Sequence, residues 1–343
     1  MKITTIGLDL AKNVFQIHAV DSASKVVLTR QLRRGKMLEF FANLSPCVVG
    51  MEACSGANYW ARELEKLGHT PKLMAPQFVK PYVKANKTDA ADAEAICEAV
   101  TRPSMRFVPI KNEEQQAVLS LHRARQGFVK ARTAQANQIR GLLAEYGIVM
   151  PRGIGKIAEM LPDIAGDADI SLPYRFRTLL LRLLHHLLEL DREAKELEAQ
   201  IVAWHKDSVE STKLAKIPGV GPMTASAIVA TIGDGRNFKN GRQFAAWLGL
   251  VPRQHSSGGK TNLLGISKRG DGYIRQLLVH GARAVVTIGK PRATETDRWI
   301  ERLRERKHTN IVCVALANKT ARVIWALLAH ERKYIHTLAP KSP

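Results

Sequence analysis

The sequence lacks paired cysteines and long uninterrupted apolar runs. Its four cysteines are scattered and form no CxxC pair: Cys47, Cys54, Cys97 and Cys313. This usage argues against a zinc ribbon and is typical of a reducing cytosol. The apolar run from Leu179 to Leu190 is broken by Arg182, His185 and His186, so we expect no membrane span. The N-terminus has one lysine and then a strand pattern, which is unlike a signal peptide.

Acidic residues are also few relative to basic ones. The 343 residues include 52 Lys and Arg against 31 Asp and Glu, which gives a formal net charge of +21. A surplus of this size exceeds what solubility requires and predicts a polyanionic partner. Nucleic acid is the favoured partner, and an anionic membrane is the weaker alternative. The length allows two or three domains with a substantial core.

The chain begins with a predicted strand that carries a carboxylate. Ile6 and Leu8 alternate with smaller or polar residues, and Asp9 follows them directly. Aspartate is depleted in strands, and a carboxylate inside a central strand is costly unless something pairs with it. Asp9 is therefore expected either to form a salt bridge or to bind a metal.

The next elements predict an α/β domain over residues 1–110. Strands at 14–20 and 25–30 complete an antiparallel meander with the first strand. A helix at 35–44, a buried strand at 47–53, an amphipathic helix at 59–67 and a short strand at 71–75 follow. Three antiparallel strands followed by alternating helix and strand is the element order of an RNase H-like fold.

Three further carboxylates are placed where they could join Asp9. Glu52 ends the buried strand, and Asp89 and Asp92 lie on one face of an alanine-rich helix. Asp89 could simply cap this helix, with Asp92 favoured by the helix dipole. Considered with Asp9 and Glu52, the pair favours a magnesium site. Mg²⁺ prefers oxygen ligands, and two metals about 3.5–4 Å apart need several bridging carboxylates.

These segments resemble the motifs of a known enzyme family. Gly-Leu-Asp at 7–9, Gly-Met-Glu at 50–52 and Lys-Thr-Asp-Ala-Ala-Asp-Ala at 87–93 are similar to the Asp-Glu-Asp-Asp tetrad of the DEDD insertion-sequence transposases. Members of this family are RuvC-like recombinases guided by a bridge RNA. The resemblance implies four Mg²⁺ ligands: Asp9, Glu52, Asp89 and Asp92. Lys87 either contacts phosphate or is a solvated lysine.

Two long helices are predicted within residues 111–210, separated by a connector rich in Gly, Pro and Asp at 141–173. The first, at 113–146, is either a solvated helix or a phosphate-binding one with the contacts Arg123, Arg125 and Arg132. The second, at 174–206, carries apolar residues at spacings of four and three. This heptad seam requires a partner helix and predicts a coiled coil, either between these helices or between subunits.

The C-terminal region, 211–335, is predicted to be helical and to contain a helix-hairpin-helix. Gly219 and Gly221 precede a helix that runs to Ile232. A glycine-containing turn before a helix presents backbone N–H groups to a phosphate. We therefore expect this turn to bind the backbone of DNA or RNA without regard to sequence.

A loop rich in small and basic residues follows, at 249–271. Its composition alone is that of a flexible turn, but 217–283 resembles the C-terminal domain of the same transposases, where a Ser-Gly motif carries the nucleophile. Here the motif has two serines, Ser256 and Ser257, and either could be the nucleophile. A serine hydroxyl needs activation, for which His255 could be a local base. The nearby cations that could bind or stabilise phosphate are Arg253, Lys260, Lys268 and Arg269.

The charge and the carboxylates predict a nucleic-acid enzyme with a Mg²⁺ site, and the resemblance implies that it is an RNA-guided transposase that cuts and rejoins DNA with a serine. The resemblance further implies a structured guide RNA from the element, a dimer or tetramer that combines half-sites, and a bacterial cytoplasmic, nucleoid-associated location. One alternative is a RuvC-type Holliday-junction resolvase that uses water and two metals. Others are a non-enzymatic nucleic-acid-binding scaffold and an actin-like phosphotransferase, although no glycine-rich phosphate loop follows the first strand.

Overall fold

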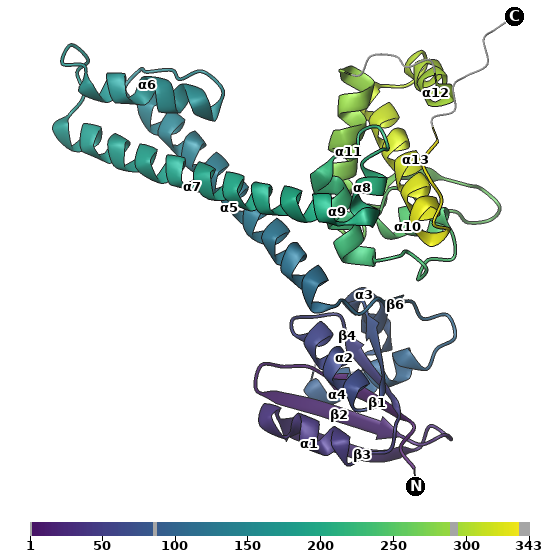
Figure 1. Cartoon of the computed structure of the whole chain (residues 1–343). Coiled ribbons are helices and arrows are strands. Elements are labelled where there is room, and N and C mark those ends of the chain that lie inside the picture. Colours follow the sequence, from purple (N-terminus) through teal and green to yellow (C-terminus); the bar gives the residue numbers. More distant parts are fainter. Residues whose placement is uncertain (1, 85–87, 289–293, 336–343) are drawn as a thin grey trace, which may run out of the picture. The chain divides into compact units, whose positions relative to one another are not determined.

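The computed structural model describes residues 2–84, 88–288 and 294–335. Lys87, a predicted phosphate contact, lies outside the described residues. The chain divides into two units, Met1–Glu113 and Glu114–Pro343 (Figure 1). Each unit has its own apolar cores, two in the first and two in the second, within the described residues.

A sheet of six strands organises the first unit, in the order β3-β2-β1-β4-β5-β6. The strands are β1 (Thr5–Asp9), β2 (Val14–Val20), β3 (Val26–Arg33), β4 (Val48–Glu52), β5 (Thr70–Met74) and β6 (Phe107–Val108). β1 to β3 form the antiparallel meander, and β4 and β5 run parallel to β1. The predicted mixed α/β domain is confirmed, and its strand order is consistent with a RuvC-like domain. The short strand β6 was not predicted.

Helices cover both faces of this sheet (Figure 1). α1 (Met37–Ala42) and α2 (Ala57–Lys66) pack on the face that carries Ile6 and Leu8. α4 (Asp89–Val100) crosses the other face, and α3 (Pro76–Val79) follows β5. Because a Cβ on Gly7 would lie 2.1 Å from the carbonyl oxygen of Ala93, only glycine allows α4 to approach β1 this closely.

The first helices of the second unit are α5 (Glu113–Ala144), which begins at the last residue of the first unit, α6 (Ile154–Gly166) and α7 (Tyr174–Asp207). Ion pairs join Arg125 to Glu198 and Arg132 to Asp191. The partners are one heptad apart on each helix and in opposite order, so α5 and α7 run antiparallel. The apolar seam of α7 packs on α5 and α6, with these buried residues in one core: Ala136, Ile139, Leu143, Ile157, Leu161, Phe176, Leu180, Leu184 and Leu187. α6 occupies much of the predicted connector.

The remainder of the second unit is a helical bundle with one small hairpin. Its helices are α8 (Val209–Leu214), α9 (Pro222–Ile232), α10 (Gly241–Trp247), α11 (Gly272–Thr287), α12 (Glu295–Arg304) and α13 (Thr309–Ala329). β7 (Pro252–Gln254) and β8 (Leu263–Ile266) pair in an antiparallel hairpin. The expectation of an irregular loop here was wrong, because a pair of glycines closes the segment into a tight turn.

α13 corrects the expectation that no segment could span a membrane. Its length and mean hydropathy are sufficient to cross a bilayer. Half of its apolar window is buried inside the bundle, where Cys313, Ala317 and Ile324 belong to the core. The core helix of a soluble domain has the same composition, so α13 gives no support for a membrane role.

Candidate functional site

The ends of β1 and β4 hold the first two predicted carboxylates. The two strands are parallel neighbours, and their register pairs Leu8 with Met51, so Asp9 and Glu52 follow side by side. Side chains alternate between the two faces of a strand. Leu8 and Met51 belong to the core under α1 and α2. Asp9 and Glu52 are the next residues on their strands, so they lie on the opposite face, the one that α4 covers, and both are half-buried.

The direction of α4 brings its first turn to the same edge of the sheet. Ala93 lies over Gly7, and the Sγ atom of Cys97 lies 4.0 Å from the carbonyl oxygen of Thr5. α4 therefore runs antiparallel to β1. The start of the helix extends toward the carboxyl end of β1, where Asp9 is located.

Asp89 and Asp92 occupy this first turn of α4. The N-cap residue is Thr88, whose Oγ1 accepts a hydrogen bond from the N–H of Ala91 at 3.2 Å. The alternative that Asp89 is the cap is therefore wrong. Asp89 is the first residue of the helix, and it is exposed. Both acidic residues are also favoured by the helix dipole at this end.

Both strand carboxylates affect the pKa of the thiol of Cys54, an exposed residue after β4. Desolvation is the largest cause that raises the pKa of this thiol. The negative charge of Glu52 is the next largest, and the negative charge of Asp9 has a smaller effect. Two carboxylates from two different strands thus act on one sulfur atom. This agrees with their convergence at the strand ends.

The donor chemistry of these four residues fits a hard divalent cation, because all of the donors are carboxylate oxygens. Among the described residues, however, no three His, Cys, Asp or Glu side chains are grouped closely enough to hold a metal. Asp9 and Glu52 end adjacent strands, and Asp89 and Asp92 lie in the first turn of α4, which extends toward the same edge of the sheet. A closed ligand shell would require the side chains of the first turn of α4 to turn toward the strand ends.

The β7–β8 hairpin presents the two predicted serines at its exposed tip. Ser257 and Lys260 flank a turn in which the N–H of Lys260 donates to the carbonyl oxygen of Ser257 at 3.0 Å. Gly258 and Gly259 have φ values of 55° and 76°. Two consecutive positive φ angles define a type I′ turn, which glycine adopts without a steric penalty.

The two serines lie on opposite faces of the hairpin. The Nε2 atom of Gln254 donates to Oγ of Ser256 at 2.8 Å, as side chains two residues apart on one face can do. Ser257, the next residue, lies on the other face together with His255. A bound phosphodiester would therefore reach one serine from one side of the hairpin and the other serine from the opposite side.

The predicted cations of the hairpin region are all exposed, Arg253 and Lys260 on the hairpin itself and Lys268 and Arg269 after its second strand. A further arginine, Arg275 on α11, was not predicted. Its Nη1 atom donates to the carbonyl oxygens of Leu248 at 2.9 Å and Arg269 at 3.3 Å. Arg275 thereby attaches the base of the hairpin to the bundle.

The predicted arginines of α5 have different environments. Arg123 is exposed. Arg125 donates to Glu198 at 2.6 Å, and Arg132 forms an ion pair with Asp191. The guanidinium groups of Arg125 and Arg132 therefore already connect α5 to α7, and of the three only Arg123 presents its side chain fully to solvent.

Gly219 and Gly221 lie in a tight turn between α8 and α9. The N–H of Val220 donates to the carbonyl oxygen of Ile217 at 3.0 Å, and Gly219 has a φ of 81°. This is a type II turn, with Pro218 at its second position. Gly219 packs on Gly281 of α11, where a Cβ would lie 1.8 Å from the carbonyl oxygen of Gly219. Gly221 is exposed at the start of α9.

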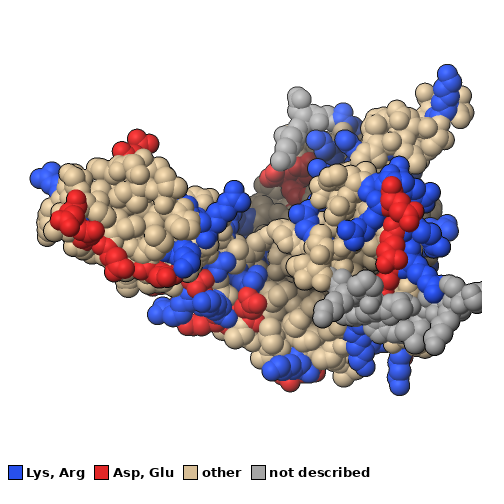
Figure 2. Space-filling view, turned by 90° about the horizontal axis from the view of Figure 1, so that it is seen from above, with Lys and Arg blue, Asp and Glu red and all other residues tan. Residues whose placement is uncertain are grey.

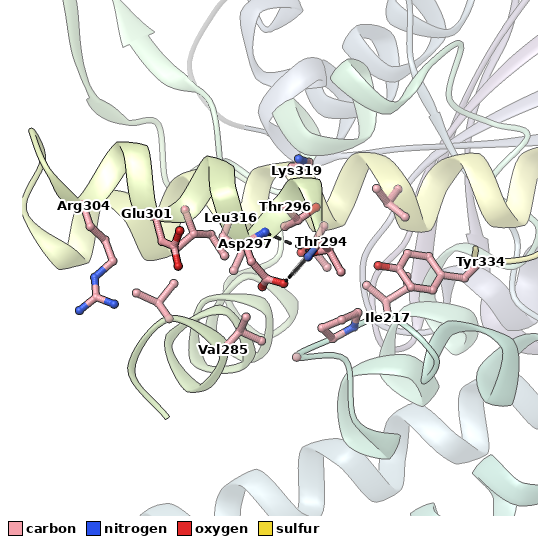
Figure 3. Close-up of a pocket in the computed structure, with 16 residues that line it drawn as sticks. Ile217, Val285, Thr294, Thr296, Asp297, Glu301, Arg304, Leu316, Lys319 and Tyr334 are labelled. Atoms are coloured by element: carbon pink, nitrogen blue, oxygen red, sulfur yellow. Dashed lines mark hydrogen bonds between the residues drawn. The ribbon is translucent and has the colours of Figure 1, made fainter. Parts of the chain in front are cut away.

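A pocket of about 140 Å³ lies behind this turn, between α11, α12 and α13 (Figure 3). The N–H of Asp297 donates to Oγ1 of Thr294 at 3.2 Å and the N–H of Thr294 donates to Oδ2 of Asp297 at 3.0 Å, so the pair forms a capping box at the start of α12. Glu301, Arg304 and Lys319 also line the pocket. Gly219 is the one predicted site residue on its lining in the described part of the chain, so the pocket is separate from the predicted chemistry.

A buried polar junction around His122 was not predicted. The two ring nitrogens of His122 lie 3.0 Å from Oγ of Ser226 and from the hydroxyl of Tyr273. Burial lowers the pKa of His122 to about 4, so the ring is neutral at pH 7. Because Ser226 donates its proton to the carbonyl oxygen of Pro222 at 2.6 Å, His122 must donate to Ser226 and accept from Tyr273. The Ser–His pair is thus structural and not nucleophilic.

Most of the excess positive charge lies in residues 208–335, whereas acidic and basic residues are nearly balanced in α5 to α7. Figure 2 shows this difference on one face: Lys and Arg side chains predominate over the bundle, and a row of acidic side chains follows the long helices. The basic surplus that predicted a polyanionic partner is therefore concentrated around the hairpin, the glycine turn and α9 to α13.

Comparison with known proteins agrees with the motifs. Residues 6–148 match the family model of DEDD transposases of the IS110 type, described as "Transposase". Residues 211–297 match the model described as "Transposase IS116/IS110/IS902 family". These two segments include all four carboxylates and both serines.

Full-length relatives are also similar. The chain is 52% identical over 335 residues to a probable family 20 transposase of Pseudomonas aeruginosa, covering 97% of this chain and 99% of that protein. It is 45% identical over 332 residues to the transposase for insertion sequence element IS1111A of Coxiella burnetii, covering 97% and 91%. It is 43% identical over 325 residues to the transposase for insertion sequence element IS1328 of Yersinia enterocolitica, covering 95% and 96%.

Proposed function

Because this chain belongs to the IS110/IS116 family of insertion-sequence transposases, we propose that it cuts and rejoins DNA with a serine nucleophile assisted by Mg²⁺-binding carboxylates. The observation that supports this best is the placement of Asp9 and Glu52. They end adjacent parallel strands on the face covered by α4, and the first turn of α4 carries Asp89 and Asp92 to the same edge.

The residues that would hold Mg²⁺ are Asp9, Glu52, Asp89 and Asp92. When bound, the metal supplies positive charge beside the phosphate that reacts. The chain itself contributes two rigid strand ends that fix Asp9 and Glu52, and a helix start whose dipole favours anionic groups. A helix start is also more readily adjusted than a central strand, which suits Asp89 and Asp92 to closing around an ion.

The serine step requires only the exchange of one phosphodiester for another. Oγ of Ser256 or Ser257 attacks the phosphorus, an Oγ–P bond forms, and the bond from phosphorus to one deoxyribose oxygen breaks. The serine proton passes to a base, for which His255 is a candidate, and the departing sugar oxygen gains a proton. A hydroxyl of another strand reverses the step and rejoins DNA. Arg253, Lys260, Lys268 and Arg269 would stabilise the charge at phosphorus.

The sequence choice would come from a structured RNA of the element, so the protein would read mainly the shape and backbone of nucleic acid. Gly219, Gly221, Arg123 and the undescribed Lys87 are proposed backbone contacts. The basic surplus over residues 208–335 supports this. We further propose a dimer or tetramer in which half-sites of different subunits combine, acting in the bacterial cytoplasm at the nucleoid.

The test is a denaturing-gel assay for a covalent protein–DNA adduct, with purified protein, the element's RNA, Mg²⁺ and labelled junction DNA. The adduct should be lost in Asp9→Asn and in one of Ser256→Ala or Ser257→Ala. Ser171→Ala, which changes an exposed serine far along the sequence from the hairpin, should behave like the parent. Cleavage without an adduct, unaffected by either serine change, would contradict the proposal and favour a water-using resolvase.

A further inference from the structure

A groove of about 1400 Å³ lies beside the serine hairpin in the second unit. One side is formed by Pro252, Leu264 and Ile266 of the hairpin, and α13 supplies much of the rest. The start of α10 and Trp299 of α12 complete the lining. The groove is thus continuous with the element that carries both serines.

The groove exposes apolar surface that the bundle does not cover. Leu264 and Ile311, on two different elements, are 41% and 55% exposed. Trp299 and Trp325 also contribute to the lining. Large exposed apolar patches on a folded protein often mark ligand-binding or interaction sites.

The charged groups of the groove are of one sign. Its cations are Arg242, Lys319 and Arg322, and within the described residues no Asp or Glu lines it. The ammonium of Lys319 lies 4.8 Å from the centroid of the Trp299 ring, which keeps this cation beside an aromatic face. A ligand for this groove must therefore present both apolar faces and negative charge.

An unpaired polynucleotide strand has this combination, because its bases can stack on apolar and aromatic side chains while its phosphates meet cations. A duplex keeps its base faces inside and presents mainly phosphates. An amphipathic helix of another chain would have to supply acidic residues to match three cations. The chemistry of the lining favours the unpaired strand.

The position of the groove connects it to the reaction. Pro252 pairs with Ile266 at the base of the hairpin, and Ser256 is four residues farther along the chain, beyond the end of β7. At about 3.3 Å per residue this is roughly 13 Å. A strand bound in the groove would place a phosphodiester only a few nucleotides away within reach of the hairpin tip.

We infer that this groove binds an unpaired nucleic-acid strand next to the phosphodiester that the hairpin serine attacks. The inference rests on the proposed function for the identity of the reacting phosphate. The binding itself follows from the lining: bases against Leu264, Ile311 and Trp299, and phosphates against Arg242 and Arg322. The groove thereby selects strands that have been separated from their complement.

The experiment measures fluorescence anisotropy of labelled oligo(dT), oligo(rU) and a duplex of equal length with the full chain. Ile311→Glu and Leu264→Glu each introduce a carboxylate into a different side of the groove. Val149→Glu changes a residue that is 86% exposed on another part of the chain and is the matched control. Arg322→Gln is compared with Arg182→Gln, which changes an exposed arginine of α7. Thermal unfolding verifies that each variant is folded.

Both groove carboxylates should weaken oligonucleotide binding by about tenfold or more, as expected when base stacking is lost, with a smaller effect on the duplex. Arg322→Gln should reduce the slope of log affinity against log salt by about 0.7. Both control variants should bind like the parent. Equal losses for oligo(dT) and oligo(rU) support a site for either strand, and a loss confined to one identifies the strand that occupies it.

Unchanged oligonucleotide affinity in both groove variants would overturn the inference. So would unchanged affinity with reduced self-association by light scattering, which would assign the groove to a second copy of the chain. The double variant Ser256→Ala, Ser257→Ala separates this from the proposed function, because it should bind oligonucleotides normally and form no adduct. If the parent itself forms no adduct while the groove variants lose binding, the inference about the groove is supported and the proposed serine mechanism is contradicted.

Discussion

Asp9 and Glu52 directly follow the register pair of Leu8 and Met51, at the carboxyl ends of two neighbouring parallel strands, on the face that α4 crosses. Two carboxylates held side by side on rigid strands repel one another unless a cation or a proton is shared. Under the proposed function, a bound Mg²⁺ would offset this repulsion, and the first two predictions follow from that proposal.

Removal of either strand carboxylate should weaken metal binding. Asp9→Asn and Glu52→Gln are each expected to reduce Mn²⁺ affinity by about tenfold or more, measured by electron paramagnetic resonance of the free ion. Glu65→Gln, which changes an exposed glutamate of α2, is the control and should bind like the parent. Equal Mn²⁺ affinity in all four proteins would argue that the carboxylates are structural.

Cys54 offers an independent measure of the same charges. Since Glu52 contributes to the raised pKa of this thiol, Glu52→Gln should lower the pKa and speed alkylation by iodoacetamide at pH 8. The other cysteines are buried, so mass spectrometry can follow Cys54 selectively. Glu65→Gln should leave the rate unchanged. A Glu52→Gln rate equal to the parent rate would mean that Glu52 does not face the thiol.

Gly7 should be indispensable for the packing of α4 on β1. The Cβ of Gly7→Ala would lie 2.1 Å from the Ala93 carbonyl oxygen, so we expect a loss of about 1–3 kcal/mol in the free energy of unfolding by urea. Gly35→Ala is the control, because a Cβ there meets nothing within 4 Å. Since a displaced α4 would also move Asp89 and Asp92, Mn²⁺ affinity should fall in Gly7→Ala alone. Equal stabilities would show that α4 does not press on β1.

His122 should make stability depend on pH. Its pKa is about 4 in the folded chain and about 6.5 when unfolded, so the unfolded state binds more protons between these values. The contribution of His122 is therefore complete above pH 6.5 and is lost as pH falls toward 4, by up to about 3 kcal/mol.

The measurement is urea unfolding at pH 7 and pH 4.5. His122→Gln should be less stable than the parent at pH 7, because Ser226 and Tyr273 lose their shared partner, and should lose less stability on acidification. His280→Gln removes an exposed imidazole and should retain the parent's pH dependence. A pH dependence in His122→Gln as steep as in the parent would contradict the account.

Local patterns were enough to predict most elements of the fold. The strand β2 (Val14–Val20) has the predicted bounds, and α7 ends one residue beyond the predicted helix, because alternation and heptad spacing are set by adjacent residues. The hairpin at Ser256 and Ser257 was missed because glycines and polar residues give a weak strand signal. The turn of the hairpin depends on the positive φ angles of Gly258 and Gly259, and composition alone does not predict these angles.

The positions of the candidate site residues in the elements could be predicted from the sequence, but their contacts with distant residues could not. The carboxylates fall at strand ends and in one helix turn, and these positions follow from local spacing. The ion pairs of Arg125 and Arg132 with α7 were not predictable, because they depend on the register of two helices far apart in sequence. The junction at His122 likewise depends on α9 and α11 meeting α5.

The most direct test of the central claim is the mass of one peptide. Trypsin cleaves after Arg253 and Lys260 and releases residues 254–260, which contain both Ser256 and Ser257. After reaction with Mg²⁺, the element's RNA and junction DNA, followed by nuclease digestion, we predict this peptide with a nucleotide attached to one serine, and only unmodified peptide in Asp9→Asn. Unmodified peptide in the parent, from a reaction in which the DNA has been cut, would contradict the serine mechanism.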